Sequence, residues 1–268
     1  MQNDRKSLFV SIVGKPNVGK SSMLNMIVNS KISIVSPKPQ TTRNKITGIL
    51  TQDNIQLVFT DTPGLLNPRS RLGNYMVSEI NNSFSGCEAC IHVVEAGKSI
   101  CNADLKLMDK FRKMKIPIIL VINKIDLLKD KSVIMEQIKD YTDKFEYFAV
   151  VPISAKSGNG REELIKELSN LAEPSVFFFD EDDITDQTER VLVSEVIREK
   201  MLHLLDKELP HGAAVFIEYF HERNDGMADI SAVIYCEREN HKAIIIGKGG
   251  RMLKNIGTLA RKELEEML

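Results

Sequence analysis

One glycine-containing segment near the start of the chain has the residue types and spacing of a phosphate site. The segment Gly14-Lys-Pro-Asn-Val-Gly-Lys-Ser21 matches the pattern G-x-x-x-x-G-K-S/T and stands between an apolar run and an amphipathic stretch. Gly14 and Gly19 let the backbone curl so that N–H groups face phosphates, and a helix beginning near Lys20 adds its positive end. We expect Lys20 to reach the β- and γ-phosphates of a nucleotide and the Ser21 hydroxyl to bind Mg²⁺.

A second motif, Asp61-Thr-Pro-Gly64, follows the strand-like run that ends at Thr60. A carboxylate at the carboxyl end of a strand, on the rim that carries a phosphate loop, suits a water-mediated hold on Mg²⁺. The Gly64 N–H can approach a γ-phosphate. Alone, this sequence is also typical of an ordinary turn, and it gains weight from its distance after the phosphate loop.

Two motifs at later strand ends have the hydrogen-bonding groups that guanine requires. In Asn123-Lys-Ile-Asp126, the Asp126 carboxylate can accept bonds from N1–H and from the exocyclic amine, and the Lys124 stem can cover the ring. Adenine would leave that carboxylate without a hydrogen-bond partner, and an unpaired buried carboxylate costs on the order of several kcal/mol. In Ser154-Ala-Lys156, the Ala155 N–H can donate to guanine O6. Together the motifs predict a guanine-nucleotide site.

The carboxyl-terminal part of the chain contains a second glycine loop, Gly247-Lys-Gly-Gly250, which resembles the GXXG loop of a KH domain. Residues 241–262 include six Lys or Arg and no Asp or Glu. Glycines allow close approach to a nucleic-acid backbone, and the basic residues would hold its phosphates. A solvated helix connector is the alternative. We expect Ile256 to join the apolar floor beneath single-stranded RNA, which would contact Ile245, Ile246, Gly247, Lys248, Gly249, Gly250, Arg251 and Lys254.

Short β-branched runs and longer amphipathic stretches alternate up to residue 172, which predicts an α/β domain with a mostly parallel sheet covered on both faces. We expect six strands, at Leu8–Val13, Ile46–Thr51, Ile55–Thr60, Ala89–Glu95, Pro117–Ile122 and Tyr147–Pro152. The turn at Gln52–Asn54 predicts a hairpin and one antiparallel edge strand. Helices are expected at Ser21–Asn29, Tyr75–Phe84, Ala103–Lys115, Val133–Lys144 and Glu162–Ala172.

The order of elements changes after an acidic stretch at Asp180–Asp183. We therefore predict a domain over 1–173, a linker over 174–187 and a smaller α+β domain over 188–268. The second domain should contain helices at Glu189–Leu205, His241–Ile246 and Arg251–Met267 and strands at Ala213–Phe220 and Ala228–Cys236. With its glycine loop, this unit resembles a KH domain of type II.

Composition places the chain among ordinary globular proteins. Its 268 residues carry 36 basic and 37 acidic side chains, so bulk charge predicts no nucleic-acid partner and the local basic stretch must supply one. Four scattered cysteines argue against a disulfide framework and favour a reducing cytosol. The longest apolar runs have the length of strands, far below the ~20 residues of a membrane span.

The four motifs together resemble those of a translation-factor-class GTPase over residues 8–172. By this resemblance Thr42 is the second protein ligand of Mg²⁺. Ras-type GTPases place Gln after D-x-x-G, where this chain has Leu65, so hydrolysis should be slow without a partner or monovalent cation. Asn17 either helps to hold K⁺ or only supports the loop.

The resemblance extends to each site residue. It assigns nucleotide binding to Gly14, Asn17, Val18, Gly19, Lys20, Ser21, Ser22, Asp61, Gly64, Asn123, Lys124, Asp126, Ser154, Ala155 and Lys156. It assigns Mg²⁺ to Ser21, Thr42 and, through water, Asp61, and catalysis to Lys20, Thr42 and Gly64.

A GTPase domain followed by a KH domain resembles the bacterial Era family over nearly the whole chain. The resemblance implies a monomeric, GTP-dependent RNA-binding switch that binds the 3′ end of 16S rRNA and assists maturation of the small ribosomal subunit. It also implies loose contact with the cytoplasmic face of the inner membrane. Members usually continue beyond the equivalent of Leu268 into another strand and helix, and a sheet without that strand should bind RNA more weakly.

Two other functions compete with this interpretation. A constitutive KH module with a weak or vestigial GTPase would bind RNA equally with GTP and GDP. A dynamin-like or tandem-GTPase assembly factor would need a long helical stalk or a second phosphate loop, and the sequence shows neither.

Overall fold

The structure is a computed structural model that describes residues 4–38, 41–42, 45–62, 86–205 and 212–268. The chain forms two compact units, each described here by itself. Unit 1 comprises Met1–Ile32 and Thr42–Asp186, and unit 2 comprises Ser33–Thr41 and Gln187–Leu268. This division differs from the predicted one in two places, because a short early segment joins unit 2 and the predicted linker joins unit 1.

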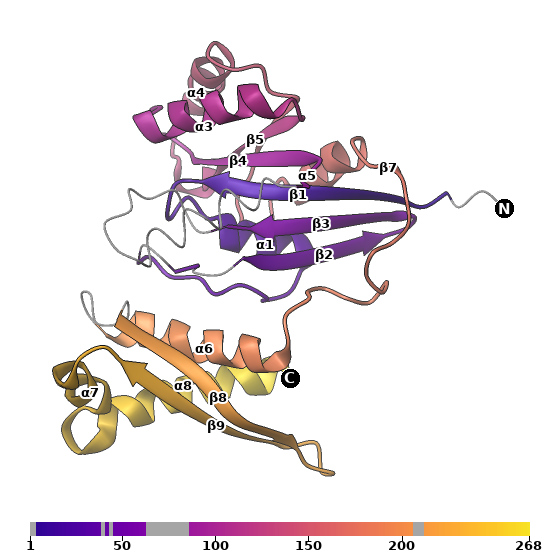
Figure 1. Ribbon diagram of the computed structural model, residues 1–268. Coiled ribbons are helices and arrows are strands. Elements are labelled where there is room, and N and C mark those ends of the chain that lie inside the picture. Colours follow the sequence, from indigo (N-terminus) through magenta and orange to yellow (C-terminus); the bar gives the residue numbers. More distant parts are fainter. Residues whose placement is uncertain (1–3, 39–40, 43–44, 63–85, 206–211) are drawn as a thin grey trace. The chain divides into compact units, whose positions relative to one another are not determined.

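Unit 1 is built on one sheet, in which β1 lies between β3 and β4 (Figure 1). Neighbouring strands run parallel except for β2 and β7, and β2 pairs antiparallel with β3 at one edge, as the predicted hairpin requires. A two-residue seventh strand, β7, pairs antiparallel with β1 and was not predicted. The described strands of this sheet are β1 (Lys6–Gly14), β2 (Ile46–Gln52), β3 (Ile55–Asp61), β4 (Ala89–Glu95), β5 (Ile118–Asn123), β6 (Ala149–Pro152) and β7 (Glu173–Pro174).

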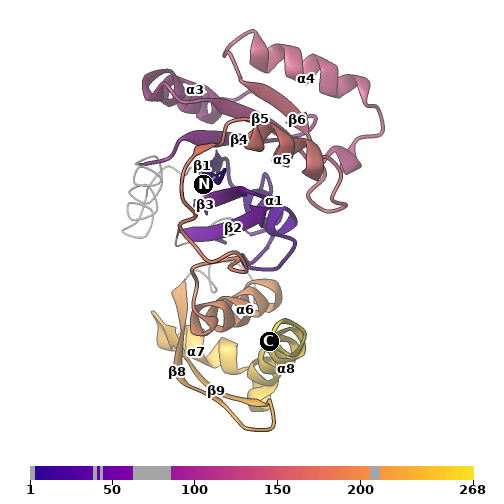
Figure 2. The ribbon, with the colours of Figure 1, turned by 90° about the vertical axis from the view of Figure 1, so that its right-hand side faces the viewer.

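Helices cover both faces of this sheet, with α1 and α3 on opposite sides (Figure 2). Alternate strand residues explain the two layers: Val10 and Ile91 pack with Leu24 and Leu164 from the helices on one face, whereas Cys90 packs with Phe111 on the other. The described helices are α1 (Lys20–Val28), α3 (Asn102–Met114), α4 (Ser132–Thr142), α5 (Arg161–Ser169) and the 3₁₀ turn η1 (Ile125–Leu127). The helix predicted at Tyr75–Phe84 lies outside the described residues.

The segment predicted to be a linker packs along unit 1 as far as residue 186. The backbone N–H groups of Phe178 and Phe179 donate to the Gln56 side-chain oxygen, and that side chain is fully buried. Further along, Ile49 N–H donates to the Ile184 carbonyl at 2.9 Å. The acidic composition alone predicts a solvent-exposed loop, but these hydrogen bonds hold the segment against the sheet.

A buried histidine in unit 1 makes stability sensitive to mild acid. His92 on β4 is 0% exposed, and its burial lowers the pKa of the imidazole although the neighbouring Asp104 opposes the shift. Below the ordinary histidine pKa of about 6.5 the unfolded chain therefore binds more protons than the folded one. We expect the free energy of unfolding to fall between about pH 7.5 and pH 5.5, and to fall less in His92→Gln. Urea midpoints at both pH values measure this, and equal falls in the two proteins would contradict it.

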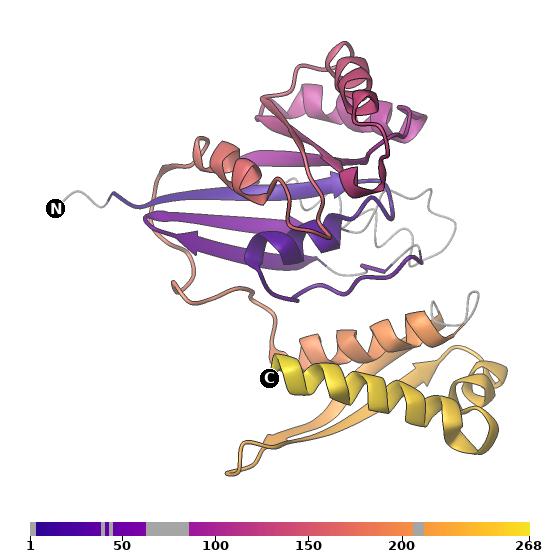
Figure 3. The ribbon, with the colours of Figure 1, turned by 180° about the vertical axis from the view of Figure 1, so that it is seen from behind.

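Unit 2 packs its helices on one face of a hairpin, and α6 and α8 lie side by side over β8 and β9 (Figure 3). Val193 and Val196 of α6 pack with Ile217 of β8 and with Ala260 and Leu264 of α8. The described elements are α6 (Glu189–Leu204), β8 (Ala213–Glu222), β9 (Ala228–Cys236), α7 (Glu239–Ile246), the 3₁₀ turn η3 (Lys248–Gly250) and α8 (Arg251–Met267). No helix in the described parts of the chain is both long and apolar enough to cross a membrane.

The early segment of unit 2, residues 33–41, is bonded to α6. Val35 N–H donates to Glu199 Oε1 at 2.9 Å, and Arg198 donates to the Thr41 carbonyl. Glu199 is also paired with Lys200 at 2.8 Å, and Lys200 pairs with Glu263 of α8. Because a buried charge is costly unless it is paired, these bonds explain how α6 can bury three consecutive charged residues.

Candidate functional site

The phosphate loop follows β1, and two close contacts explain its glycines. A Cβ atom on Gly14 would lie 2.4 Å from the Val93 carbonyl oxygen, and one on Gly19 would lie 2.3 Å from Asn123 Nδ2. Gly19 also has φ +94°, which L side chains rarely adopt. These glycines let the loop lie against β4 and β5 at the carboxyl ends of the strands.

Lys20 begins α1, as predicted, and its side chain is almost fully buried. Its Nζ donates to the Gly14 carbonyl at 3.3 Å and to the Lys15 carbonyl at 3.1 Å, so the ammonium lies over the loop. Burial lowers the pKa of Lys20, and the negative charge of Asp61 opposes that shift. A cation held over backbone that curls around phosphates is suited to bind the β- and γ-phosphates.

The three predicted Mg²⁺ ligands converge on one point. Ser21 Oγ donates to Asp61 Oδ2 at 2.6 Å and lies 2.9 Å from Thr42 Oγ1. The cluster contains two hydroxyls, from Ser21 on α1 and from Thr42, and the carboxylate of Asp61 at the end of β3. Mg²⁺ prefers such hard oxygen ligands. The residues therefore fit the ion, which Ser21 and Thr42 would bind directly and Asp61 through water.

Asn123, at the end of β5, connects the phosphate loop to both base motifs. Its Nδ2 donates to the Val18 carbonyl at 2.9 Å, and its Oδ1 accepts from Ala155 N–H at 3.0 Å and from Lys124 N–H at 2.7 Å. A fully buried amide with three satisfied bonds fixes the three motifs relative to one another. Sequence analysis predicted Asn123 as a site residue but could not show that it joins the motifs.

The base-recognition residues are also held in place. Ser154 Oγ donates to Asp126 Oδ1 at 2.6 Å, which orients an exposed carboxylate at the rim. Lys124 Nζ donates to the Asn17 carbonyl at 2.7 Å and pairs with Glu95 at 2.6 Å. Sequence reasoning missed Glu95, although its position at the carboxyl end of β4 was the available signal.

Most of the remaining predicted residues lie near the phosphate loop or the base motifs, and one lies outside the described residues. Val18 is buried in the core beneath the loop, Ser22 lies in the first turn of α1, and Lys156 is exposed beside the base motifs. Gly64 and the neighbouring Leu65 lie outside the described residues, so the structure does not place the predicted γ-phosphate contact.

In unit 2 the glycine loop lies between α7 and α8, as expected, and its backbone requires glycine. Gly247, Gly249 and Gly250 have φ values of +71°, +62° and +76°. A Cβ atom on Gly247 would lie 2.7 Å from Met252 Cβ, whereas one on Gly249 or Gly250 would meet nothing within 4 Å. The outer two glycines therefore leave open space for another backbone to approach. Lys248, Arg251 and Lys254 are exposed on and after the loop.

Of the three isoleucines predicted to form the apolar floor of the RNA groove, two are buried in unit 2 and one is exposed. Ile245 and Ile256 are 3% and 1% exposed, because they pack with Met201 of α6 in the core of unit 2. Ile246 is 39% exposed, together with its neighbour Ile244 at 48% and Leu253 at 43%, so these three offer the apolar surface beside the loop.

Comparison with known families matches both units. Residues 9–124 match the family model of the 50S ribosome-binding GTPase, and residues 208–268 match that of the KH domain.

Similar proteins cover nearly the whole chain. GTPase Era of Clostridioides difficile strain 630 is 49% identical over 264 residues, which are 98% of this chain and 89% of the relative. GTPase Era of Ruminiclostridium cellulolyticum is 44% identical over 98% of this chain and 88% of the relative.

Solved structures agree. The crystal structure of a variant of Aquifex aeolicus Era bound to GDP·AlF4⁻ matches with a TM-score of 0.92 and 37% identity, over 97% of this chain and 89% of that one. A crystal structure of Era in complex with MgGDPNP and nucleotides 1506–1542 of 16S ribosomal RNA matches equally, at the same identity and coverage. With the phosphate loop, the guanine motifs and the KH loop in one chain, this protein belongs to the Era family of GTPases.

Proposed function

We propose that this protein is a GTP-hydrolysing switch whose KH unit binds the 3′ end of 16S rRNA and which assists maturation of the small ribosomal subunit. Its family membership and the solved relative that holds both MgGDPNP and nucleotides of 16S rRNA support this function. The exposed basic and apolar residues around Gly249 are the surface in this chain that suits single-stranded RNA.

The residues of unit 1 define how GTP would be held. The loop amides and Lys20 bind the phosphates, Asp126 and Ala155 select guanine, and Ser21 and Thr42 hold Mg²⁺, which when bound neutralises charge on the phosphates. No side chain of this set is placed to activate water, and Leu65 cannot polarise it. We therefore propose slow hydrolysis that a partner or a monovalent cation near Asn17 accelerates.

One observation carries the coupling of GTP to RNA. Residues 33–41 belong to unit 2, whereas Thr42 belongs to unit 1, so the boundary falls at the peptide bond between Thr41 and Thr42. Arg198 of α6 binds the Thr41 carbonyl, and Thr42 Oγ1 lies beside Ser21 in the cluster that suits Mg²⁺. We propose that a ligand which orders Thr42 also restrains Thr41, its neighbour in the chain, whose carbonyl is bonded to Arg198.

We expect this protein to bind a single-stranded RNA of the 16S 3′ end about tenfold or more tightly with a non-hydrolysable GTP analogue than with GDP. Arg198→Met keeps the side-chain stem but removes the donors to Thr41, so it should reduce that ratio toward one. Fluorescence anisotropy with labelled RNA measures both affinities. Equal affinities in the unsubstituted protein would favour the alternative, a constitutive KH module with a weak or vestigial GTPase.

A second pair of variants tests the RNA surface in the same assay. Lys248→Ala removes an exposed cation at the loop and should weaken RNA binding in both nucleotide states. It should also lower the slope of log Kd against log salt concentration by about one, as expected for the loss of one phosphate contact. Lys139→Ala removes an exposed lysine from α4 of unit 1 and serves as the control. If both variants bind alike, RNA does not bind at the glycine loop.

Peripheral contact with the inner membrane and a monomeric state are further proposals. They come from family resemblance, and vesicle flotation and sedimentation equilibrium, respectively, would test them.

A further inference from the structure

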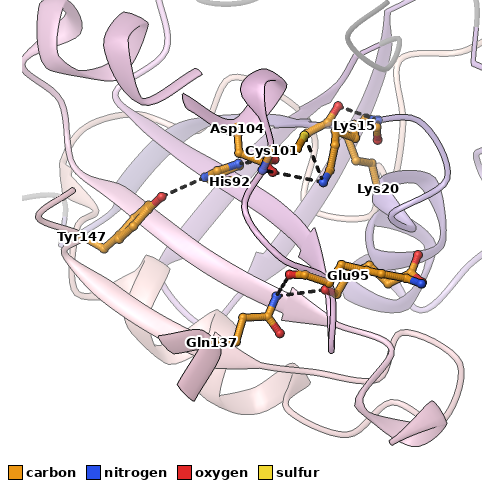
Figure 4. Close-up of polar contacts among 10 residues, drawn as sticks. Lys15, Lys20, His92, Glu95, Cys101, Asp104, Gln137 and Tyr147 are labelled. Atoms are coloured by element: carbon orange, nitrogen blue, oxygen red, sulfur yellow. Dashed lines mark hydrogen bonds and ion pairs between the residues drawn. The ribbon is translucent and has the colours of Figure 1, made fainter. Parts of the chain in front are cut away.

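A polar cluster lies behind the phosphate loop, formed by Lys15, His92, Cys101, Asp104 and Tyr147, of which His92 and Asp104 are fully buried (Figure 4). We call it the Asp104 cluster. It joins α3, β4 and Tyr147, which precedes β6, to the second residue of the loop, and none of its members was predicted as a site residue.

Lys15 turns its side chain away from the phosphate-binding face and into this cluster. Its Nζ donates to Asp104 Oδ2 at 3.0 Å and lies 3.6 Å from Cys101 Sγ. Its own carbonyl accepts from Lys20 Nζ. Lys15 therefore connects the lysine that lies over the loop with a carboxylate on α3.

Asp104 is fixed at the start of α3. Its side chain is 0% exposed, and Oδ2 accepts from the Cys101 N–H at 3.0 Å, which closes a capping box. Burial would raise the pKa of this carboxyl, but His92, the Cys101 N–H and Lys15 outweigh it and hold the pKa well below the usual range. The group is thus a buried carboxylate, and Lys15 supplies the opposite charge that such a group requires.

His92 lies against Asp104 on the other side, and Tyr147 bonds to His92. His92 Nε2 lies 3.7 Å from Asp104 Oδ1, and its Nδ1 lies 3.0 Å from the Tyr147 hydroxyl. The imidazole packs edge-on against Phe111 and Tyr141, with ring centroids 5.4 and 5.9 Å away. These rings enclose the imidazole, whereas the bonds from Lys15 and from the Cys101 N–H are the ones that hold the carboxylate.

We infer that Asp104 is a positioning residue for the nucleotide site, because it anchors Lys15 and so holds the phosphate loop in its binding shape before the nucleotide arrives. The loop needs such support, since Asn17 and Gly19 both have positive φ and an unanchored loop would have to be ordered on binding. This inference rests on guanine-nucleotide binding by the family and does not depend on the RNA proposal.

The variant Asp104→Asn separates an anchoring role of Asp104 from a purely electrostatic one, because the two roles predict opposite changes in nucleotide affinity. Asp104→Asn removes a negative charge near the phosphates and frees the Lys15 cation, which should tighten nucleotide binding if Asp104 acts only through its charge. If Asp104 instead anchors the loop, the same substitution should weaken binding and speed release. The sign of the change therefore separates the two roles.

The experiment measures affinity and release rate of a fluorescent N-methylanthraniloyl-GDP with the full chain. We expect Asp104→Asn and Lys15→Met each to weaken binding about tenfold, mostly through faster release, and the double variant to be no weaker than the worse single one. Asp109→Asn, an exposed aspartate on the same helix, is the matched control and should bind as the unsubstituted protein does.

Urea unfolding without nucleotide separates a loss of fold from a loss of anchoring. Variants that lose stability but keep the original affinity would overturn the inference, as would tighter binding by Asp104→Asn or additive effects in the double variant. If Asp104→Asn does not fold, the comparison of Lys15→Met with Lys15→Arg decides, because arginine can still reach the carboxylate and should retain the original affinity. Equal weakening in these two variants would also overturn the inference.

Discussion

Asp126→Asn should exchange the base that this protein prefers. Ser154 holds the Asp126 carboxylate at the rim, where its oxygens can accept from N1–H and the exocyclic amine of guanine. An asparagine presents an amide donor at one of those positions, which opposes guanine but suits the carbonyl oxygen that xanthine has in place of the amine. We expect GDP affinity to fall about a hundredfold, or about 2.7 kcal/mol, while xanthosine diphosphate becomes the better ligand. Competition titrations against a fluorescent nucleotide measure both.

The measured affinity for xanthosine diphosphate shows whether the variant is folded, because a misfolded variant would bind neither nucleotide. Asp130→Asn provides the control, since Asp130 is an exposed aspartate four residues further along the chain and bonds with Ser132. Unchanged GDP affinity in Asp126→Asn would show that the base is read elsewhere.

Gly19→Ala should abolish nucleotide binding, with a loss of at least about a hundredfold, which is about 2.7 kcal/mol. The new Cβ atom would lie 2.3 Å from Asn123 Nδ2, so it must displace the amide that joins the phosphate loop to the base motifs. The variant Gly226→Ala has a similar positive φ, +80°, with nothing within 4 Å, and it isolates the backbone cost of about 1 kcal/mol.

Binding of GDP and thermal unfolding should therefore be measured for both glycine variants. A Gly19→Ala protein that binds GDP as well as Gly226→Ala does would mean that the contact with Asn123 has no part in the site.

The sequence was most informative where function depends on local spacing. The phosphate loop, the guanine motifs and the glycine loop of unit 2 are each contiguous, and alternation of apolar runs located the strands that carry them. The turn at Gln52–Asn54 also predicted one antiparallel strand at an edge, and that strand is β2. These features follow from short-range geometry, so a single sequence suffices to predict them.

What could not be predicted depends on distant residues meeting. Ile245 and Ile246 are neighbours of the same type, and only packing against α6 shows that the first is core and the second surface. Lys15, His92 and Asp104 are far apart in the sequence, with no spacing that marks them as a group. The assignment of 33–41 to unit 2 likewise needs the bonds to Arg198 and Glu199.

The segment that follows β7 has a consequence for the solubility of the nucleotide-binding half alone. Ile184 and Thr185 bond to Ile49 and Thr47 on β2, the strand at the open edge of the sheet. An uncovered edge strand invites pairing with another molecule, so a chain that ends at Pro174 would offer β2 as a template for self-association. Residues 175–186 therefore protect the β2 edge from such pairing. An isolated nucleotide-binding unit should include them to remain soluble.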